Sequence, residues 1–129
     1  MVDRLPQLIV TGSRGFADYP ALARCLDEVW SFRSFDQLWH GGAAGADRLA
    51  SSWASLNRVR TQVWLPDWNA YGKGAGLVRS RAMVDSAHPL SIVAVFCKGP
   101  LDSSAGTRAC VGFARAAGLR IWRIVTSWP

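Results

Sequence analysis

A turn made almost wholly of glycine and alanine is the feature that most constrains this chain. It covers residues 40–47, which read His-Gly-Gly-Ala-Ala-Gly-Ala-Asp. An apolar stretch at residues 35–39 precedes it, and a helical pattern with one apolar face follows it to about Asn57. Such small residues between a strand and a helix let another molecule approach the backbone, where free helix N–H groups favour an anion. A tight connection without a ligand fits the same residues equally well.

Strand patterns and helix patterns alternate along the rest of the chain. Two continuous apolar runs predict strands buried on both faces, at residues 8–10 and 92–96. Two runs of alternating apolar and polar residues predict half-exposed edge strands, at residues 58–65 and 119–125. Together with the apolar stretch before the glycine turn, these runs give five strands.

Four helices are predicted between the strands. They cover, in order, residues 18–33, 46–57, 75–87 and 104–117. Asp18 is the expected N-cap of the first helix, Gly118 the expected C-cap of the last, and residues 67–76 are predicted to form a loop.

This alternation predicts a single α/β domain over residues 1–129, with a parallel five-stranded sheet covered by helices on both faces in a three-layer sandwich. Because the first and fourth strands look central, the expected strand order is 3-2-1-4-5. Ligands in such sheets bind at the carboxyl ends of the strands, where the order changes direction. Turns at residues 12–16, 40–47 and 104–107 would converge there, which favours a ligand-binding crevice.

Composition narrows the class of protein. At 129 residues, half of them hydrophobic, the chain can bury the core of one domain. Cys25, Cys97 and Cys110 lie in apolar patterns without metal-ligand spacing, so we expect buried free thiols in a reducing compartment. With neither a signal-peptide pattern nor an apolar run near the roughly 20 residues of a membrane span, the sequence predicts a cytoplasmic protein without a membrane partner.

The net charge of +6 raises the question of a nucleic-acid partner. The positive charge is nearly all arginine and is scattered along the chain, with no basic run. Dispersed arginine suits a small phosphorylated ligand as well as it suits a polymer. Any nucleic-acid binding is therefore expected to be non-specific.

Cationic side chains near the turns are candidates for anion binding. Arg14, inside the first turn, can clamp a phosphate or be a surface arginine. Lys73, Arg79 and Arg81 flank the start of the third helix and suit a second anionic group, or form a solvated basic face.

Several other polar and aromatic residues could have either a structural role or a ligand-binding role. The carboxylate of Asp47 is stabilised by the helix dipole whether or not a ligand binds. If it contacts a ligand, we expect it to bind sugar hydroxyls, because it would repel a phosphate. Ser104 and Thr107 can donate to phosphate, cap the fourth helix, or do both. His40 is expected to be a satisfied strand-end histidine rather than a catalyst, and Trp68 can stack on a base or pack in the core, as can Tyr71.

Two common nucleotide-binding patterns are absent. Around Lys73 the phosphate-loop pattern fails because Asp67 stands at its first glycine position and Gly74 follows the lysine. The spaced glycines of the dinucleotide motif are missing after the first strand.

The chain nevertheless resembles the YspA-type branch of the SLOG superfamily over nearly its whole length. The resemblance lies in Gly12-Ser13-Arg14, the turn at residues 40–47, residues 67–76 with Arg79 and Met83, and Ser104-Ala105-Gly106-Thr107. It implies a Rossmann-like fold and a module that binds a nucleotide or nucleotide sugar. The superfamily includes cytokinin-activating phosphoribohydrolases, the DNA-processing DprA proteins and sensors of NAD-derived nucleotides.

Two departures from the family pattern bear on function. Ser80 follows Arg79 where this branch usually has asparagine, so a side-chain amide contact is lost. The phosphoribohydrolases carry a glutamate after their glycine-threonine pair, whereas no carboxylate follows Thr107 closely. Only Asp47 or Asp102 remains as a substitute acid or base.

The sequence thus predicts a module that binds a nucleotide or nucleotide-derived ligand, related to ADP-ribose or NAD, as a sensor or a sequestering protein. The alternatives are a nucleotide hydrolase or phosphoribohydrolase and, second, non-specific DNA binding. No metal or cofactor is expected, and the oligomeric state, a homo-oligomer included, stays open. The predicted ligand-binding residues are Gly12, Ser13, Arg14, Gly41, Gly42, Gly45, Asp47, Asn69, Lys73, Arg79, Ser104, Gly106 and Thr107.

Overall fold

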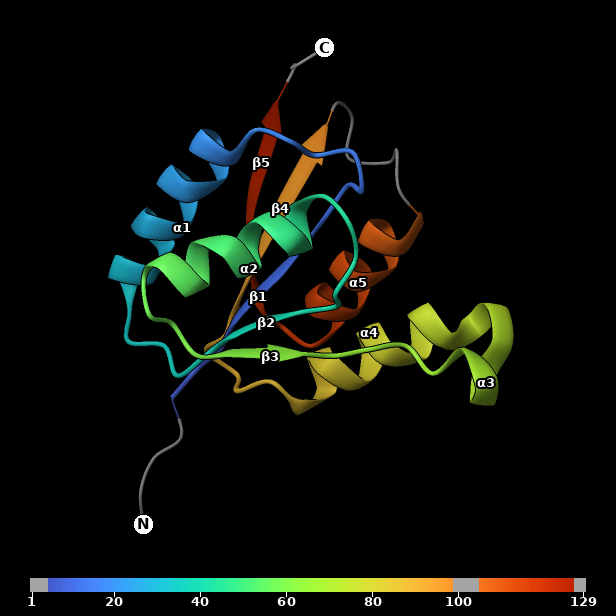
Figure 1. Ribbon diagram of the computed structural model, residues 1–129. Helices are drawn as coiled ribbons and strands as arrows, with labels where there is room; N and C mark the ends of the chain where they lie inside the picture. Colours follow the sequence, from blue (N-terminus) through green and yellow to red (C-terminus); the bar gives the residue numbers. More distant parts are fainter. Residues whose placement is uncertain (1–4, 99–104, 127–129) are drawn as a thin grey trace.

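The computed structural model describes residues 5–98 and 105–126. Its centre is one sheet of five parallel strands in the order β3-β2-β1-β4-β5 (Figure 1). The strands are β1 (Leu8–Gly12), β2 (Leu38–His40), β3 (Thr61–Val63), β4 (Ile92–Lys98) and β5 (Arg120–Thr126). The expected strand order and parallel direction are confirmed.

Helices cover both faces of the sheet. They are α1 (Tyr19–Phe32), α2 (Ala46–Leu56), α3 (Trp68–Tyr71), the 3-10 helix η1 (Gly72–Gly74), α4 (Ala75–Ser86) and α5 (Ala105–Ala116). α1 and α2 pack on one face, and α4 and α5 pack on the other (Figure 1). This is the predicted three-layer, Rossmann-like arrangement.

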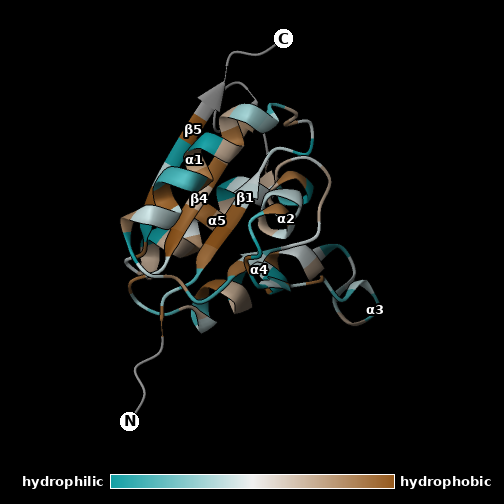
Figure 2. Cartoon of the chain, turned by 60° about the vertical axis from the view of Figure 1, so that its left-hand side comes forward, coloured by the Kyte–Doolittle hydropathy of each residue, from teal (hydrophilic) through white to brown (hydrophobic). Residues whose placement is uncertain are grey.

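The core follows the alternation of the central strands. Leu8, Val10 and Phe96 point toward α1 and α2, whereas Ile9 and Val95 point toward α4 and α5. All five are essentially inaccessible, and burying each such side chain stabilises the fold by about 1.5–3 kcal/mol. The strongly apolar strands between the helices stand out in Figure 2.

The ends of α1 and α5 match the sequence prediction. The carboxylate of Asp18 accepts a hydrogen bond from the N–H of Ala21 at 3.1 Å, and a proline lies in the first turn of α1. Beyond α5, Gly118 takes a positive φ of 76°, which a glycine adopts without strain.

Two predictions about local structure are wrong. The segment at residues 67–76 is not a loop, because α3, η1 and the start of α4 run through it. Asp67 caps α3 by accepting from the N–H of Ala70 at 3.0 Å, so a short helix forms where glycine suggested irregular chain. The second strand begins at Leu38 rather than at residue 35, because its register with β1 starts at the pair Leu8 and Leu38.

The three cysteines are buried free thiols, as predicted. Burial raises the pKa of Cys25 and of Cys110 to about 11, so both stay protonated at neutral pH. Within residues 5–98 and 105–126, no helix is both long and apolar enough to span a membrane.

Candidate functional site

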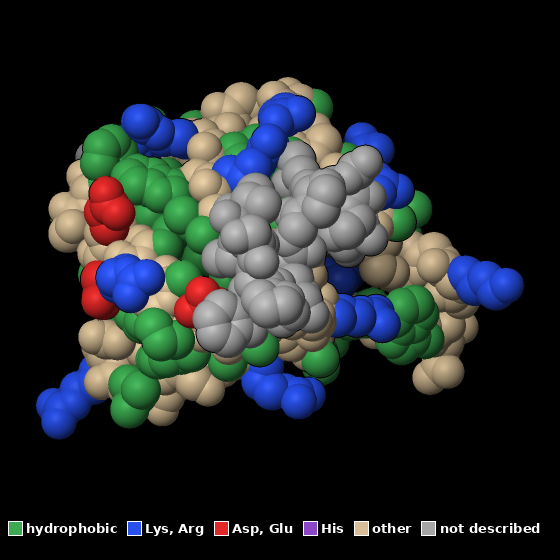
Figure 3. Space-filling view, turned by 90° about the horizontal axis from the view of Figure 1, so that it is seen from above, with side chains coloured by type: hydrophobic (Ala, Val, Ile, Leu, Met, Phe, Trp, Pro, Cys, Tyr) green, Lys and Arg blue, Asp and Glu red, His purple; other side chains and the backbone are tan. Residues whose placement is uncertain are grey.

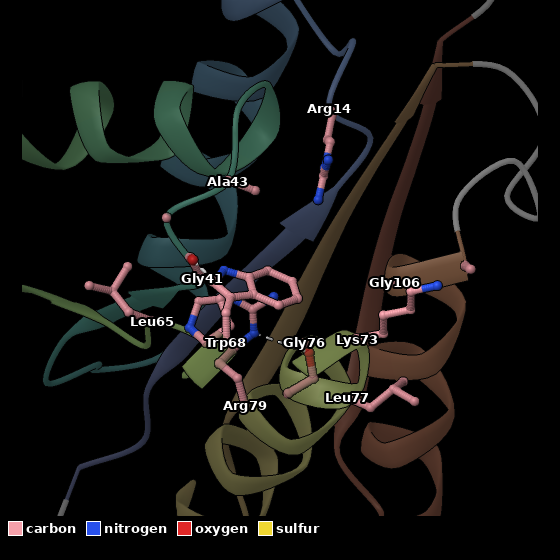
Figure 4. A pocket seen from close by; sticks show the side chains of 14 residues that line it. Arg14, Gly41, Ala43, Leu65, Trp68, Lys73, Gly76, Leu77, Arg79 and Gly106 are labelled. Carbon is pink, nitrogen blue, oxygen red and sulfur yellow. Dashed lines mark hydrogen bonds between the residues drawn. The ribbon is translucent and has the colours of Figure 1, made fainter. Parts of the chain in front are cut away.

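A cleft of about 550 Å³ lies beyond the ends of β1 and β2 (Figure 4). Six segments contribute to it: the turn after β1, the turn at residues 40–47, the chain after β3, α3, the η1–α4 region and the start of α5. The described lining residues are Arg14, Gly41, Gly42, Ala43, Leu65, Pro66, Trp68, Lys73, Gly76, Leu77, Arg79, Ser80, Ala105 and Gly106. All three turns singled out in the sequence therefore reach one cleft.

Arg79 forms the floor of the cleft and ties three elements together. Its Nη1 donates to the carbonyl oxygens of Gly41 at 2.8 Å and Trp64 at 3.1 Å, and its Nε donates to the hydroxyl of Ser80 at 3.3 Å. These bonds fix α4 to the chain that follows β2 and β3. A Cβ at Gly41 would collide with the Arg79 guanidinium, so this glycine makes room for the arginine.

Asp47 braces the glycine turn from beneath. Its Oδ2 accepts hydrogen bonds from the backbone N–H groups of Gly41 at 3.0 Å and Ala43 at 3.2 Å. The side chain is buried, and burial raises its pKa to about 6, although the two bonds and the nearby Arg79 act in the opposite direction. Asp47 is not among the residues that line the cleft, so its carboxylate serves the turn rather than an open surface.

His40 lies at the end of β2 and is only half satisfied. Its Nδ1 accepts the N–H of Gly42 at 2.9 Å, which places the proton of the neutral ring on Nε2. Nε2 is buried without a partner. Burial and the positive charge of Arg79 lower the pKa of His40, so the ring is uncharged at neutral pH. The expected strand-end histidine is therefore present, but one of its two nitrogens is unpaired.

Two further glycines bring the turns against each other. A Cβ at Gly12 would collide with the Phe96 carbonyl oxygen, and one at Gly45 would collide with the backbone of Arg14. Gly45 also has a φ of 77°, which other residues rarely adopt. Beside it, the N–H of Ala46 donates to the carbonyl of Ser13 at 3.3 Å. These glycines serve close packing within the chain.

The cleft combines positively charged side chains with apolar surface. The side chains of Arg14 and Lys73 are exposed at its rim, and Figure 4 shows Arg14 pointing from the turn after β1 into the cleft. None of the described lining residues is acidic. Leu65, Trp68 and Leu77 supply apolar surface, and Figure 4 shows Leu77 beside Lys73 and Leu65 at the opposite edge of the cleft. The cleft therefore offers both positive charge for an anion and apolar surface for a flat group.

The structure separates the predicted site residues into groups. Those that line the cleft are Arg14, Gly41, Gly42, Lys73, Arg79 and Gly106. Those outside the lining are Gly12, Ser13, Gly45, Asp47, Asn69 and Thr107. Of the latter, Asn69 is exposed on α3, whereas Asp47 and Thr107 are buried. Ser104 and the candidate acid Asp102 lie outside the described residues.

Sequence reasoning missed most of the apolar wall. Trp68 was considered as a residue that could stack on a base, and the lining residues not considered as ligand-binding are Ala43, Leu65, Pro66, Gly76, Leu77, Ser80 and Ala105. Leu65 and Pro66 follow the edge strand at its carboxyl end, which is where parallel sheets bind ligands, so their position in the chain was an available signal. Across residues 5–98 and 105–126, no group of three or more histidine, cysteine, aspartate or glutamate side chains is placed to hold a metal ion.

Comparison with known proteins points to one family. The YspA, cpYpsA-related SLOG family matches residues 6–71, which run from before β1 to the end of α3. The chain is also 32% identical over 121 residues to the Gene 61 protein of Mycobacterium phage D29, which covers 89% of this chain and 93% of that protein. No solved structure matches the chain.

Proposed function

The chain belongs to the YspA, cpYpsA-related SLOG family, and on this premise we propose that its cleft binds a nucleotide or a nucleotide-derived ligand such as ADP-ribose. The observation that carries the proposal is the pairing, in one cleft, of exposed cations with an aromatic and aliphatic wall. A volume of about 550 Å³ is in the range of small-molecule sites, which span roughly 300–1,000 Å³.

In the proposed complex, the phosphate end lies between Arg14 and the first turn of α5. Ala105 and Gly106 line the cleft there, and the N–H groups at the start of a helix attract an anion. A Cβ at Gly106 would meet nothing within 4 Å, so the backbone is open to a ligand. Arg14 adds a charge-assisted hydrogen bond, and Lys73 supplies a second cation from η1.

The base or sugar end lies against the apolar wall. Trp68 offers an indole face that stacks with a planar ring, and Leu65 and Leu77 flank it (Figure 4). The wall carries no aligned set of base-reading side chains, so selectivity for the phosphate is expected to exceed selectivity for the base.

The proposal is binding rather than turnover, in a sensor or sequestering protein. Cleavage of an N-glycosidic bond needs a carboxyl group at the ribose, and none of the described lining residues supplies one. Asp47, one of the two substitutes considered, is engaged with the backbone of the glycine turn. Free base appearing from AMP or NAD incubated with the pure protein would favour the hydrolase alternative, and Asp102→Asn would then test the other carboxylate.

DNA binding is the weaker alternative. Figure 3 views the ends of the strands and shows lysine and arginine side chains standing apart around this face, not gathered in one patch. Such contacts are non-specific and lose about 10³-fold or more in affinity between 50 and 200 mM salt. A sequence-selective gel shift that survives roughly 0.3 M salt would favour DNA as the ligand.

Calorimetry with two matched arginine variants tests the proposal. The probes are ADP-ribose, NAD, AMP and, as the unphosphorylated reference, adenosine. Arg14→Ala should weaken binding of the phosphorylated probes by roughly tenfold to a hundredfold, the value of about 1.5–3 kcal/mol for a charge-assisted bond. Arg120→Ala removes the same charge from β5, where the guanidinium lies over the ring of Phe32, and should leave binding nearly unchanged.

Three results would contradict the proposal. One is the absence of binding by any phosphorylated probe. Another is adenosine binding as tightly as AMP, because the phosphate would then contribute nothing. The last is equal weakening by Arg14→Ala and Arg120→Ala, which would mean that the positive charge acts diffusely.

A further inference from the structure

The backbone of the glycine turn is held by bonds that come from beneath the cleft. The N–H groups of Gly41 and Ala43 donate to Oδ2 of Asp47 at 3.0 Å and 3.2 Å. The N–H of Gly42, between them, donates to Nδ1 of His40 at 2.9 Å. Gly41, Gly42 and Ala43 line the cleft, so the two side chains lie directly behind part of its wall. Because these three N–H groups are engaged, an anion in the cleft has to be held elsewhere.

Asp47 brings a negative charge to the back of a cleft that otherwise suits an anion. Among the described residues it is the only acidic side chain that is buried, with 7% of its surface exposed. The described lining of the cleft holds no acidic residue and carries Arg14 and Lys73. A buried charge acts over a longer distance than an exposed one, because little water and salt lie around it to screen it. Anion binding and the charge of Asp47 are therefore expected to oppose each other.

The start of α5, where the proposed complex holds the phosphate, lies close to Asp47. The negative charge of Asp47 contributes to the raised pKa of the thiol of Cys110, a buried residue of α5. Ala105 and Gly106 line the cleft and precede this cysteine by about 6–8 Å along the helix axis, at 1.5 Å per residue. An anion at the start of α5 is therefore roughly 10 Å from the Asp47 carboxylate.

We propose that binding of an anionic ligand in this cleft is coupled to the uptake of a proton by Asp47, so that the affinity of the site increases as the pH falls. The inference rests on the proposed function and adds a regulatory property to the same site. A bound anion repels the Asp47 carboxylate but not its neutral form. By linkage, a ligand that favours the protonated form binds more tightly where that form is populated.

The geometry lets Asp47 take up a proton while it keeps its bonds to the turn. Both backbone N–H groups donate to Oδ2, so Oδ1 is the atom that can be protonated. A protonated carboxyl group still accepts hydrogen bonds at its other oxygen. Burial raises the pKa of Asp47 to about 6 in the free protein, which brings the protonated form close to neutral pH.

Four other ionisable groups lie around Asp47 and the turn. Arg79, from α4, lowers the pKa of Asp47 and stays charged, as does Arg14 in the cleft. The Cys110 thiol, from α5, has a pKa of about 11 and stays neutral. His40, from β2, has a lowered pKa, and a proton on its Nδ1 would remove the bond that it accepts from the turn. Asp47 is therefore the group of this cluster whose charge changes most readily near neutral pH.

The size and direction of the pH effect follow from the distance. At an effective dielectric constant of about 20, a unit charge about 10 Å away favours the neutral form of a carboxyl group by roughly tenfold. The additional affinity is fully present below about pH 6, and it is lost as the pH rises through the higher pKa of Asp47 in the complex. Between pH 8 and pH 5.5 we expect the affinity for an anionic ligand to increase about fivefold to tenfold.

Calorimetric titration of the full chain with ADP-ribose, from pH 5.5 to pH 8 at constant ionic strength, tests the proposal. ADP-ribose is the suitable probe because its diphosphate keeps its charge over this range, whereas the monoester phosphate of AMP titrates near pH 6. At pH 6.5, titrations in two buffers that differ in enthalpy of ionisation count the protons. The wild-type protein should take up about half a proton for each ADP-ribose bound.

Two variants separate charge from structure. Asp47→Asn imitates the neutral form, so its affinity for ADP-ribose should stay within about twofold over the range and exceed the wild-type affinity at pH 8 by about fivefold to tenfold. If Asp47 only held the turn in place, Asp47→Asn would instead bind more weakly than the wild type at pH 8. Asp67→Asn is the matched control, because Asp67 is exposed, caps α3 and does not line the cleft. It should keep the wild-type pH dependence.

An affinity for ADP-ribose that does not change with pH in the wild-type protein would overturn the inference and leave the proposed function standing. A pH dependence that persists in Asp47→Asn would also overturn it, since another group, such as His40, would then bind the proton. If ADP-ribose bound at no pH in this range, the proposed function and the inference would both fail. Thermal melts show whether each variant is folded. If Asp47→Asn is not, the proton count for the wild type decides, because no uptake at pH 6.5 contradicts the proposal.

Discussion

Two glycine-bearing segments border the cleft, and they are built in opposite ways. The turn at residues 40–47 is held from beneath by the Asp47 carboxylate and from the side by Arg79. The segment at residues 67–76 is largely exposed, and neither α3 nor η1 buries a residue. In sequence the two share one conspicuous feature, since each carries three glycines. The turn at residues 40–47 is therefore held by buried hydrogen bonds, whereas the segment at residues 67–76 forms an exposed outer wall of the cleft.

The glycines of the two segments differ in the space around them. Gly41 and Gly45 are needed because other parts of the chain occupy the space that a side chain would fill. Gly74 has no atom within 4 Å of an added Cβ, and its φ is −83°. Glycine content alone therefore does not indicate a ligand loop, because glycine also permits close packing within the protein.

The largest expected effect comes from adding one methyl group to each segment. Gly45→Ala should lower the free energy of unfolding by about 4 kcal/mol, because it combines a strained backbone with a collision against the turn after β1. Gly74→Ala should change it by less than about 0.5 kcal/mol. Urea unfolding of both variants measures the difference. Similar values for the two would contradict the contrast between a packed turn and an open wall.

Removal of one carboxylate from each segment should give the next largest difference. Asp47→Ala leaves the N–H groups of Gly41 and Ala43 without their acceptor, the first of them buried and the second partly buried, which should cost about 3 kcal/mol. Asp67→Ala removes only an exposed N-cap of a four-residue helix and should cost about 1 kcal/mol or less. The same unfolding experiment compares them. If Asp67→Ala proved the more damaging, α3 would be supporting the fold, contrary to its exposed position.

Stability should depend on pH through Asp47. In the folded chain this carboxyl keeps its proton up to about pH 6, whereas its ordinary pKa is 3.8. Between these values the folded state binds more protons, so raising the pH favours unfolding. Relative to Asp47→Asn, the wild-type protein should therefore lose about 2 kcal/mol of stability from pH 4 to pH 7.

Asp47→Asn is the suitable reference because it keeps the shape of the side chain and an acceptor oxygen for the turn. His40 is present in both proteins, so its own titration largely cancels in the comparison. Urea unfolding at pH 4, 5, 6 and 7 gives the difference at each pH. A difference that stays constant would show that Asp47 titrates as an ordinary carboxyl group despite its burial.

The sequence was sufficient to predict the fold and the position of the cleft, but not the bonds that hold the cleft together. Buried and alternating apolar runs determine which strands are central, and the order follows from that. Arg79 shows the limit, because its contacts with Gly41 and Trp64 join residues 38 and 15 positions apart. Nothing in local periodicity encodes such a contact. The role of Asp47 could not be predicted either. A carboxylate in the first turn of a helix is explained by the helix dipole alone, and only the structure shows that it accepts hydrogen bonds from Gly41 and Ala43.

The prediction of a loop at residues 67–76 was wrong for a different reason. Its glycines and asparagine favour turns, but a short helix forms there, and the Asp67 carboxylate caps it by accepting a hydrogen bond from the N–H of Ala70. Because that helix is exposed, no burial pattern marked it in advance. Leu77 was missed as a wall residue for a similar reason, because it is exposed on α4 and a helical pattern does not show what an exposed residue faces.

The smallest expected effect distinguishes the two aromatic residues of α3. Trp68 lines the cleft, whereas Tyr71, three positions later, lines a neighbouring hollow enclosed by β3, α3 and α4. Trp68→Ala should weaken ADP-ribose binding by about tenfold, since stacking of an aromatic side chain on a base contributes roughly 1–3 kcal/mol. Tyr71→Ala should leave that affinity within about twofold, because Tyr71 does not line the cleft. Calorimetry with ADP-ribose on both variants measures the difference. Equal loss of nucleotide affinity in both variants would mean that α3 acts as a single unit, and that the outer wall of the cleft depends on the whole helix rather than on one indole ring.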